Sequence, residues 1–333
     1  MCSLARIGAA AAAALLVQLA AFPGQAQPKT VLKLGNVQAP GMVVQTGLRR
    51  LSDLVRERTN GQVEIQVFPA AQLGSEQEML EGVQLGTVHM FEGSAGSIGR
   101  FLPQLEAFAC PFLWKSADSM LKTVRGPIGD ELSRELLQKR GLRILDMGWI
   151  FGVRHLTTAR TPVRTPQDMK GLKVRVQPDA IYLATVRAMG GSPTPIDANE
   201  LYTALQTGVV DGQENPISNI WNRKFHEVQK YLILTGHITQ NQVVVINEAT
   251  FQKLAPEQRD ILVKATIEAG DFQNGLIEKA EREDLAKLKA GGMEVIEPDV
   301  AAFRSAAANA CRDPGIERKL GKGFYDRLAA TQQ

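Results

Sequence analysis

Apolar and polar residues alternate in QVEIQVF, residues 62–68, which predicts a strand with one buried face. A further strand is predicted over residues 31–38, and GLRRLSDLVRERTNG between them places its leucines on one face of an amphipathic helix. The order strand, helix, strand is typical of a βαβ unit, so the two strands are expected to run parallel. A second helix is expected directly after Ser75, because Ser75 and Glu78 form a capping box.

The same kinds of element recur around the strand 172–177, which lies within the segment GLKVRVQPD. A short helix capped by Thr165 precedes this strand, and a continuous apolar run, QVVVIN, predicts a buried strand further on. In chain order, the later elements expected are helices over 179–191 and 198–208, a short strand and turn over 209–216, a helix over 216–232 and the buried strand over 242–247.

One long helix is predicted from Pro256 to about Ala290, because apolar residues recur every three or four positions along this segment. A late strand, MEVIEP, and two short helices complete the chain. No loose or low-complexity linker separates the two α/β halves. The fold class predicted is therefore α/β, with two lobes joined by several crossings and a long helix that is able to pass along both.

Arg175 interrupts this regular pattern. Strands of α/β units are usually covered on both faces and apolar throughout, and ligands bind at the carboxyl ends of such strands, where Arg175 lies. A guanidinium group stays charged at neutral pH and needs a partner when it is buried. Two partners remain open from the sequence: an internal carboxylate, which is the commoner case, or the carboxylate of a small ligand held in a bidentate pair.

Four more residues carry similar alternatives. Asn215 precedes a proline that starts a helix, so it is an N-cap or part of an anion site at the helix N-terminus. Arg154 follows the apolar strand RILDMGWIF and is either a surface charge or a residue that binds a ligand. Glu76 is the first residue of a predicted helix, where its negative charge interacts favourably with the helix dipole. Trp149 is either a core residue or part of a pocket wall.

The N-terminus has the features of a secretory signal peptide. One positive charge, Arg6, precedes an apolar run over residues 7–22, and small residues follow up to Ala26. Cleavage is expected after Ala26, which leaves an exported and soluble mature chain. The alternative is a membrane anchor, but the run is short for a bilayer span and contains Gln18.

Composition and motifs narrow the function classes. The chain of 333 residues has a formal net charge of +3, and no basic patch with interleaved aromatic residues points to a nucleic acid. Its four histidines lack metal-ligand spacing, and no GxSxG, Walker or GxGxxG motif occurs, so no metal, cofactor or catalytic residue is predicted. Export permits a disulfide between Cys110 and Cys311, although two separate core cysteines fit the sequence as well.

Three segments, FPAAQLGSEQEMLEGVQLGTVHM, GLKVRVQ and ELYTALQTGVVDGQENP followed by FHEVQKYLILTGH, resemble the extracytoplasmic solute-binding proteins of TRAP transporters, the DctP-type family. The resemblance covers about residues 30–325 in order and spacing. It implies a periplasmic monomer that binds a small organic acid in a cleft between two lobes and delivers it to the membrane subunits of the transporter. The lobes expected are 27–150 with about 240–280, and 151–239 with about 281–325.

The resemblance assigns the carboxylate of the ligand to Arg175, which matches the arginine of the family's KVRV strand. Arg154 matches a second family arginine, and Asn215 matches the asparagine of GQENP that supports the same carboxylate. The other residues expected at the cleft are Gln38, Glu76, Glu92, Ser94, Trp149, His237 and Gln240.

Two positions depart from the sialic-acid-binding members of that family. Ala198 stands where those members have an aromatic residue, and Val37 or Gln38 stands where they have an asparagine. We therefore expect a hydroxylated acid, such as a uronate or aldonate, whose hydroxyl groups suit Glu76, Gln38 and Asn215. The alternatives are a C4-dicarboxylate, with the second family arginine binding the second carboxylate, or another monocarboxylate or 2-oxoacid. Outside this class, the competing functions are a periplasmic enzyme acting on a carboxylate and a ligand sensor for a receptor.

Overall fold

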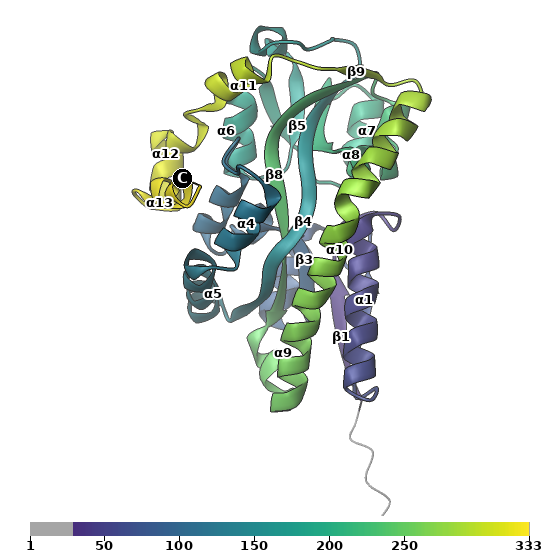
Figure 1. Cartoon of the computed structure of the whole chain (residues 1–333), viewed down its shortest axis with the longest axis vertical. Helices are drawn as coiled ribbons and strands as arrows, with labels where there is room; N and C mark the ends of the chain where they lie inside the picture. Colours follow the sequence, from purple (N-terminus) through teal and green to yellow (C-terminus); the bar gives the residue numbers. More distant parts are fainter. Residues whose placement is uncertain (1–28, 333) are drawn as a thin grey trace, which may run out of the picture.

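A computed structural model describes residues 29–332 as one nine-stranded mixed sheet with helices on its faces (Figure 1). The predicted signal peptide lies outside the described residues. The strands are β1 (Thr30–Gly35), β2 (Val63–Phe68), β3 (Met90–Ser94), β4 (Leu142–Thr158), β5 (Lys173–Val176), β6 (Ser192–Pro195), β7 (Gly212–Pro216), β8 (Tyr231–Asn247) and β9 (Glu294–Ile296).

The helices differ greatly in length. The α-helices are α1 (Val43–Arg58), α2 (Glu76–Leu85), α3 (Ala95–Ile98), α4 (Ala117–Val124), α5 (Pro127–Arg140), α6 (Ala180–Ala188), α7 (Leu201–Gln206), α8 (Ile217–Asn222), α9 (Glu248–Gln252), α10 (Pro256–Ala290), α11 (Val300–Ala307), α12 (Pro314–Leu320) and α13 (Phe324–Ala330). Short 3-10 helices are η1 (Pro103–Ala109), η2 (Pro166–Met169), η3 (Phe225–Glu227) and η4 (Ala310–Arg312).

Two long antiparallel strands, β4 and β8, join the two ends of the sheet. The strand order is β2-β1-β3-β8-β4-β7-β5-β6, and β9 pairs with β8 off this path. We call the β1–β3 end lobe I and the β5–β7 end, with β9, lobe II. The helix α10 packs against α1 of lobe I and α8 of lobe II, so it spans both lobes as predicted (Figure 1).

The local sequence predictions hold best where nearby residues determine the structure. Strands β1 and β2 are parallel, with Leu32 opposite Ile65. The capping box of Ser75 and Glu78 is present at the start of α2. The long helix has the predicted bounds, and its glycine at position 270 lets it approach the core, since a Cβ there would lie 2.6 Å from an indole nitrogen.

Two predictions of element bounds and one of the number of helices are wrong. The helix expected over 216–232 is limited to α8 and η3, because Lys224 between them adopts a left-handed conformation with φ of 59° and Tyr231 begins β8. Strand β4 continues past its apolar run to Thr158, so Arg154 lies within a strand with a fully buried side chain and is not a surface charge. The chain also ends in three α-helices, where two were expected.

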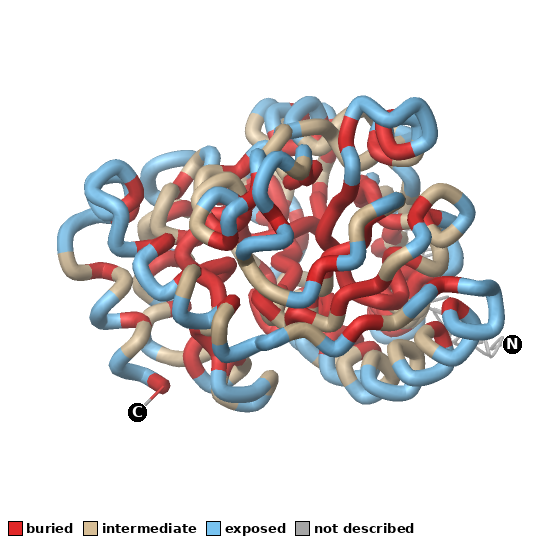
Figure 2. Tube along the Cα trace, turned by 90° about the horizontal axis from the view of Figure 1, so that it is seen from above, coloured by how far each residue is buried: buried red, intermediate tan, exposed pale blue. Residues whose placement is uncertain are grey.

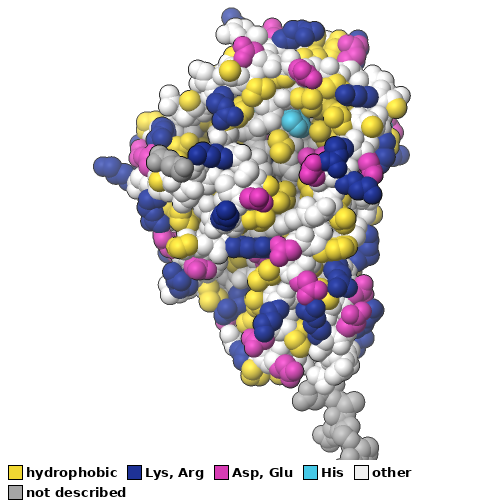
Figure 3. Space-filling model, viewed as in Figure 1, with side chains coloured by type: hydrophobic (Ala, Val, Ile, Leu, Met, Phe, Trp, Pro, Cys, Tyr) yellow, Lys and Arg dark blue, Asp and Glu magenta, His cyan; other side chains and the backbone are white. Residues whose placement is uncertain are grey.

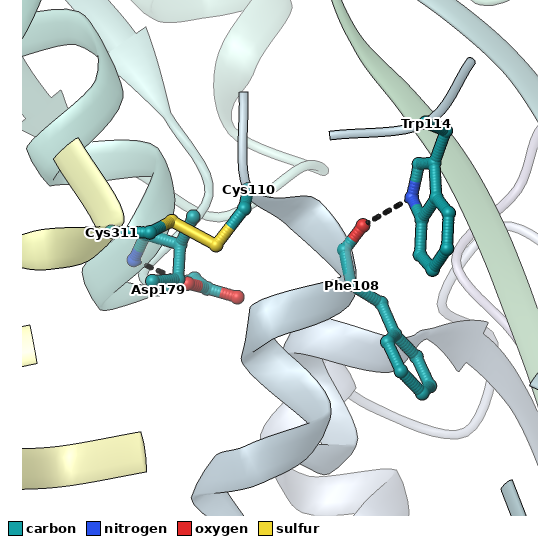
Figure 4. Close-up of a disulfide and its surroundings, with 6 residues drawn as sticks. Phe108, Cys110, Trp114, Asp179 and Cys311 are labelled. Carbon is teal, nitrogen blue, oxygen red and sulfur yellow. Dashed lines mark hydrogen bonds between the residues drawn. A yellow bond between two sulfur atoms is a disulfide. The ribbon is translucent and has the colours of Figure 1, made fainter. Parts of the chain in front are cut away.

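A disulfide joins Cys110 to Cys311, which settles the alternative that the sequence left open. Their Cα atoms are 6.0 Å apart although 201 positions separate them in the chain. Figure 4 shows the bond beside Asp179 of lobe II, with the indole of Trp114 donating a hydrogen bond to the carbonyl of Phe108 nearby, at 2.8 Å. The disulfide therefore ties the C-terminal segment to the residue that directly follows η1.

Buried residues form the interior along the whole sheet, while the exposed positions lie on the helices and loops around it (Figure 2). On the face seen in Figure 3, basic and acidic side chains are interspersed and neither sign forms a large separate patch. Within residues 29–332, no helix combines the length and apolar character needed to cross a membrane.

Candidate functional site

A cavity of about 460 Å³, including its mouth, lies between the two lobes. Lobe I, the crossing strands β4 and β8, and lobe II all contribute to its lining. Seven of the ten residues predicted from the sequence line it, namely Gln38, Glu76, Ser94, Arg154, Arg175, Asn215 and Gln240. The other lining residues are Val37, Phe151, Gln177, Pro178, Asp197, Ala198, Leu201, Asn219 and Arg223.

Arg175 is a buried cation without an ion pair in the described part of the chain. Its side chain is 2% exposed, and only Nε has a protein partner, the carbonyl of Ile196 at 2.7 Å. Burial lowers its pKa to about 10; Glu214 opposes this shift, whereas the charges of Arg154 and Arg223 add to it. The guanidinium still carries its charge at neutral pH. Its two terminal nitrogens are therefore available to an anion in the cavity.

Arg154 differs, because its charge is already neutralised. Its Nε donates to Oε2 of Glu214 at 2.5 Å and its Nη2 to Oε1 at 2.8 Å, a bidentate pair. Nη1 donates to Gln240, and the guanidinium lies 5.0 Å from the ring centre of Tyr182. Burial alone would raise the pKa of Glu214, but the charge of Arg154 and the bonds from His237 and Arg154 hold it below its usual value. Arg154 thus offers the cavity little unpaired charge.

Asn215 lies in β7 and does not cap the following helix, so the N-cap interpretation is wrong. The N-cap position is Pro216, and no side chain caps α8. The Asn215 Nδ2 donates to Gln213 Oε1 at 2.5 Å, and its Oδ1 accepts from Asn219 at 2.6 Å. These bonds fix the orientation of a carboxamide that lines the cavity beside Arg175.

Lobe I contributes polar side chains to the other wall of the cavity. Glu76 is the first residue of α2, and burial raises its pKa. Ser94 accepts from the backbone of Ser97 at 3.1 Å and donates to Gln177 of lobe II at 3.2 Å. The carboxamide of Gln38 has no partner among residues 29–332 and is buried at the cavity. This wall is suited to hydroxyl groups, which both donate and accept hydrogen bonds.

Three of the predicted residues do not line the cavity. Trp149 is buried between α1 and α10. His237 lies behind Arg154, with Nε2 at 3.3 Å from Glu214. Glu92 is fully buried in β3, neither carboxylate oxygen has a partner in the described chain, and burial with the charge of Glu76 raises its pKa to about 8.

The sequence interpretation missed Asn219 and Arg223, which also line the cavity. A signal for both was present, because Asn219 and Arg223 are spaced by four residues and so share one face of the predicted helix 216–232, which directly follows Asn215. Polar residues on the face of a helix that follows a cleft strand are candidates for the same site.

Residues 34–315 match the family described as bacterial extracellular solute-binding protein, family 7. The chain belongs to this family, which supplies the solute-binding components of TRAP transporters. One relative, the sialic acid-binding periplasmic protein of Vibrio cholerae, is 35% identical over 301 residues, covering 90% of this chain and 92% of that protein. Another, the 2,3-diketo-L-gulonate-binding periplasmic protein of Escherichia coli, is 35% identical over 302 residues, covering 90% of this chain and 92% of that protein.

The solved structures give the same result for the fold. A TRAP periplasmic solute-binding protein from Actinobacillus succinogenes with bound L-galactonate matches with a TM-score of 0.86 and 33% identity. The match covers 91% of this chain and 99% of that one. The sequence-based expectation of a two-lobed solute-binding protein is therefore confirmed.

Proposed function

We propose that this family 7 solute-binding protein captures a hydroxylated sugar acid, a uronate or aldonate, with Arg175 as the anchor of its carboxylate. The observation that carries the proposal is a buried guanidinium at the cavity with no carboxylate partner in residues 29–332. A carboxylate bound to its two terminal nitrogens forms a bidentate, charge-assisted pair. Asn215, held by Gln213 and Asn219, supports the same carboxylate.

The wall opposite the anchor favours hydroxyl groups on the ligand. Gln38, Ser94 and Glu76 present acceptors and donors from lobe I, and Asp197 adds a carboxylate from lobe II. Solved relatives hold chemically similar acids: L-galactonate, D-erythronate and β-D-galacturonate. We disfavour sialic acid because Ala198 at the cavity replaces the aromatic residue expected for that ligand.

A C4-dicarboxylate is the second candidate, because one solved relative holds succinate. The second carboxylate of such a dicarboxylate is expected from the sequence to bind Arg154. The bidentate pair of Arg154 with Glu214 argues against this, since a second anion there would meet a neutral pair. We therefore place the dicarboxylate behind the sugar acids.

The proposed role is capture and delivery, without turnover of the ligand. The signal peptide is cleaved after Ala26, and the mature monomer works in the periplasm and hands its ligand to the membrane subunits of a TRAP transporter. The proposed lobes are residues 29–150 with about 240–280, and 151–239 with about 281–325, which the disulfide between Cys110 and Cys311 also joins. Closure of the lobes over the acid changes the surface that the membrane subunits meet.

Isothermal titration of the refolded mature protein tests the proposal. L-Galactonate, D-galacturonate, D-erythronate and succinate are titrated, and a neutral sugar serves as control. We expect a sugar acid to bind most tightly, Arg175→Met to abolish binding, and mass spectrometry to recover the acid chemically unchanged. Equal binding by the neutral sugar, or full affinity of the Arg175→Met variant, would contradict the anchor, and a converted acid would indicate an enzyme.

A further inference from the structure

A row of hydrogen bonds runs along α8 from the carboxylate-binding end of the cavity. Asn215 Oδ1 accepts from Asn219 Nδ2 at 2.6 Å, and Asn219 Oδ1 accepts from Arg223 Nε at 2.9 Å. Asn215 lies in β7, Asn219 on α8 and Arg223 directly after α8, so these hydrogen bonds hold the three side chains in a row. All three line the cavity. The orientation of Arg223 is therefore set by the same row that orients Asn215.

The guanidinium of Arg223 joins the two lobes. Arg223 follows α8 in lobe II, and its Nη2 donates to the carbonyl of Val37, which follows β1 in lobe I, at 2.5 Å. Its Nη1 donates to the carbonyl of Ala198 in lobe II at 3.0 Å. Between the cavity residues of the two lobes, the other side-chain bond is the longer contact from Ser94 to Gln177 at 3.2 Å. Among residues 29–332, Arg223 thus makes the shorter of these two contacts across the cleft.

Arg223 keeps donors and charge that the protein itself does not use. An arginine has five N–H groups, and three of those of Arg223 are bound to Asn219, Ala198 and Val37. No carboxylate forms an ion pair with Arg223 within residues 29–332. Burial lowers the pKa of Arg223 to about 10, and the negative charge of Glu76 opposes this shift. Two N–H groups of a charged side chain at the cavity therefore remain for a ligand.

We propose that Arg223 is a further binding residue of this site, which holds lobe II to lobe I over the bound acid and donates its two remaining N–H groups to oxygen atoms of that acid. The inference rests on the proposed function, because it takes an organic acid as the occupant. It adds a ligand requirement: the acid carries oxygen atoms beyond the carboxylate that Arg175 binds. Hydroxyl or oxo groups of a sugar acid meet this requirement, as does the second carboxylate of a dicarboxylate, whereas an alkyl chain does not.

Arg223→Met tests the proposal, because methionine keeps an unbranched side chain and removes every donor. Lys224→Met is the matched control, since Lys224 is the next residue, is 70% exposed and has only a surface ion pair with Glu227. Spin labels on cysteines introduced at the exposed positions Gln72 of lobe I and Glu200 of lobe II report the distance between the lobes. Cys110 and Cys311 are joined in the disulfide and do not take the label, and the mature protein, which begins after Ala26, does not contain Cys2.

We expect Arg223→Met to shift the label distances to longer values with and without L-galactonate, and Lys224→Met to leave them unchanged. L-Galactonate affinity should fall about 10- to 100-fold in Arg223→Met, mainly through faster dissociation, as for the loss of charge-assisted hydrogen bonds. Asn219→Ala should lengthen the label distances less than Arg223→Met, because it removes the bonds that orient Arg223 and Asn215 but leaves the bond from Arg223 to Val37.

Unchanged distances and unchanged dissociation in a folded Arg223→Met protein would overturn the inference. The result is separable from the proposed function. If Arg175→Met keeps full affinity while Arg223→Met loses it, the anchor is wrong and the role of Arg223 stands. If wild-type protein binds no acid of the panel, the label distances of the unliganded variants still decide whether Arg223 holds the lobes together.

Discussion

Two of the three cavity arginines, Arg175 and Arg154, should respond in opposite ways to the same substitution. Arg175 has no ion-pair partner in the described chain, whereas Arg154 is paired with Glu214 in a buried bidentate contact. Removing an unpaired buried charge relieves a desolvation cost, but removing one member of a buried pair leaves the other charge uncompensated. We therefore predict that Arg175→Met stabilises the unliganded protein and that Arg154→Met destabilises it.

The pKa of Arg175 indicates the size of the effect. Its value falls from 12.5 to about 10, and each unit of pKa corresponds to about 1.4 kcal/mol, so the charged form costs the folded state roughly 3 kcal/mol at neutral pH. This cost declines only as the pH rises through about 10, because there the folded state loses its proton before the unfolded state does. The substitution also removes the hydrogen bond to Ile196, worth about 1 kcal/mol. The net gain expected is about 2 kcal/mol.

Calorimetric unfolding of the unliganded proteins at pH 7 measures both changes. A gain of about 2 kcal/mol corresponds to a rise in melting temperature of a few degrees for a chain of this size. Arg154→Met should instead lose about 3–5 kcal/mol, as for a broken buried ion pair. Equal destabilisation by both substitutions would refute the reasoning, because it would mean that Arg175 also has an internal partner.

Three further predictions concern the scaffold. Cys110→Ser opens a loop of 201 residues, and the chain entropy regained by the unfolded state should lower the free energy of unfolding by about 5 kcal/mol. Denaturant melts measure this loss, and unchanged stability would contradict the prediction. Gly270→Ala places a Cβ 2.6 Å from the indole nitrogen of Trp149 and should lower the free energy of unfolding by about 1–3 kcal/mol. Gly275→Ala on the same helix meets no atom within 4 Å and should raise the free energy of unfolding by about 0.5–1 kcal/mol; thermal melts measure both changes. Glu92 has a pKa of about 8 in the folded state, above its unfolded value of 4.5, so the free energy of unfolding should fall as the pH rises from about 4.5 to about 8. Glu92→Gln should reduce the difference in stability between pH 5 and pH 8, which thermal melts at the two pH values measure.

Much of the fold follows from patterns within a few residues. The capping box at Ser75, the parallel β1–β2 pair and the bounds of α10 were predictable because a helix start, a strand face or a helical stripe depends on neighbouring side chains. The same reasoning failed at 216–232, where pairing of Tyr231 with Thr158 extends β8 into a segment with helical periodicity. Tertiary pairing overrode the local preference there.

The candidate site, like the fold, was predictable from the sequence only in part. The sequence by itself showed that Arg175 is a charge in a position where a strand should be apolar, and the family resemblance named its partner as a carboxylate ligand. Only the tertiary structure decided that Arg154 is paired and that Arg175 has no ion pair among residues 29–332, because the carboxylate of Glu214 comes from a strand 60 positions away from Arg154. It likewise decided the disulfide across 201 positions and the contact of Arg223 with Val37 across 186. Whether a charge is neutralised depends on distances between residues far apart in the chain, and no local pattern contains those distances.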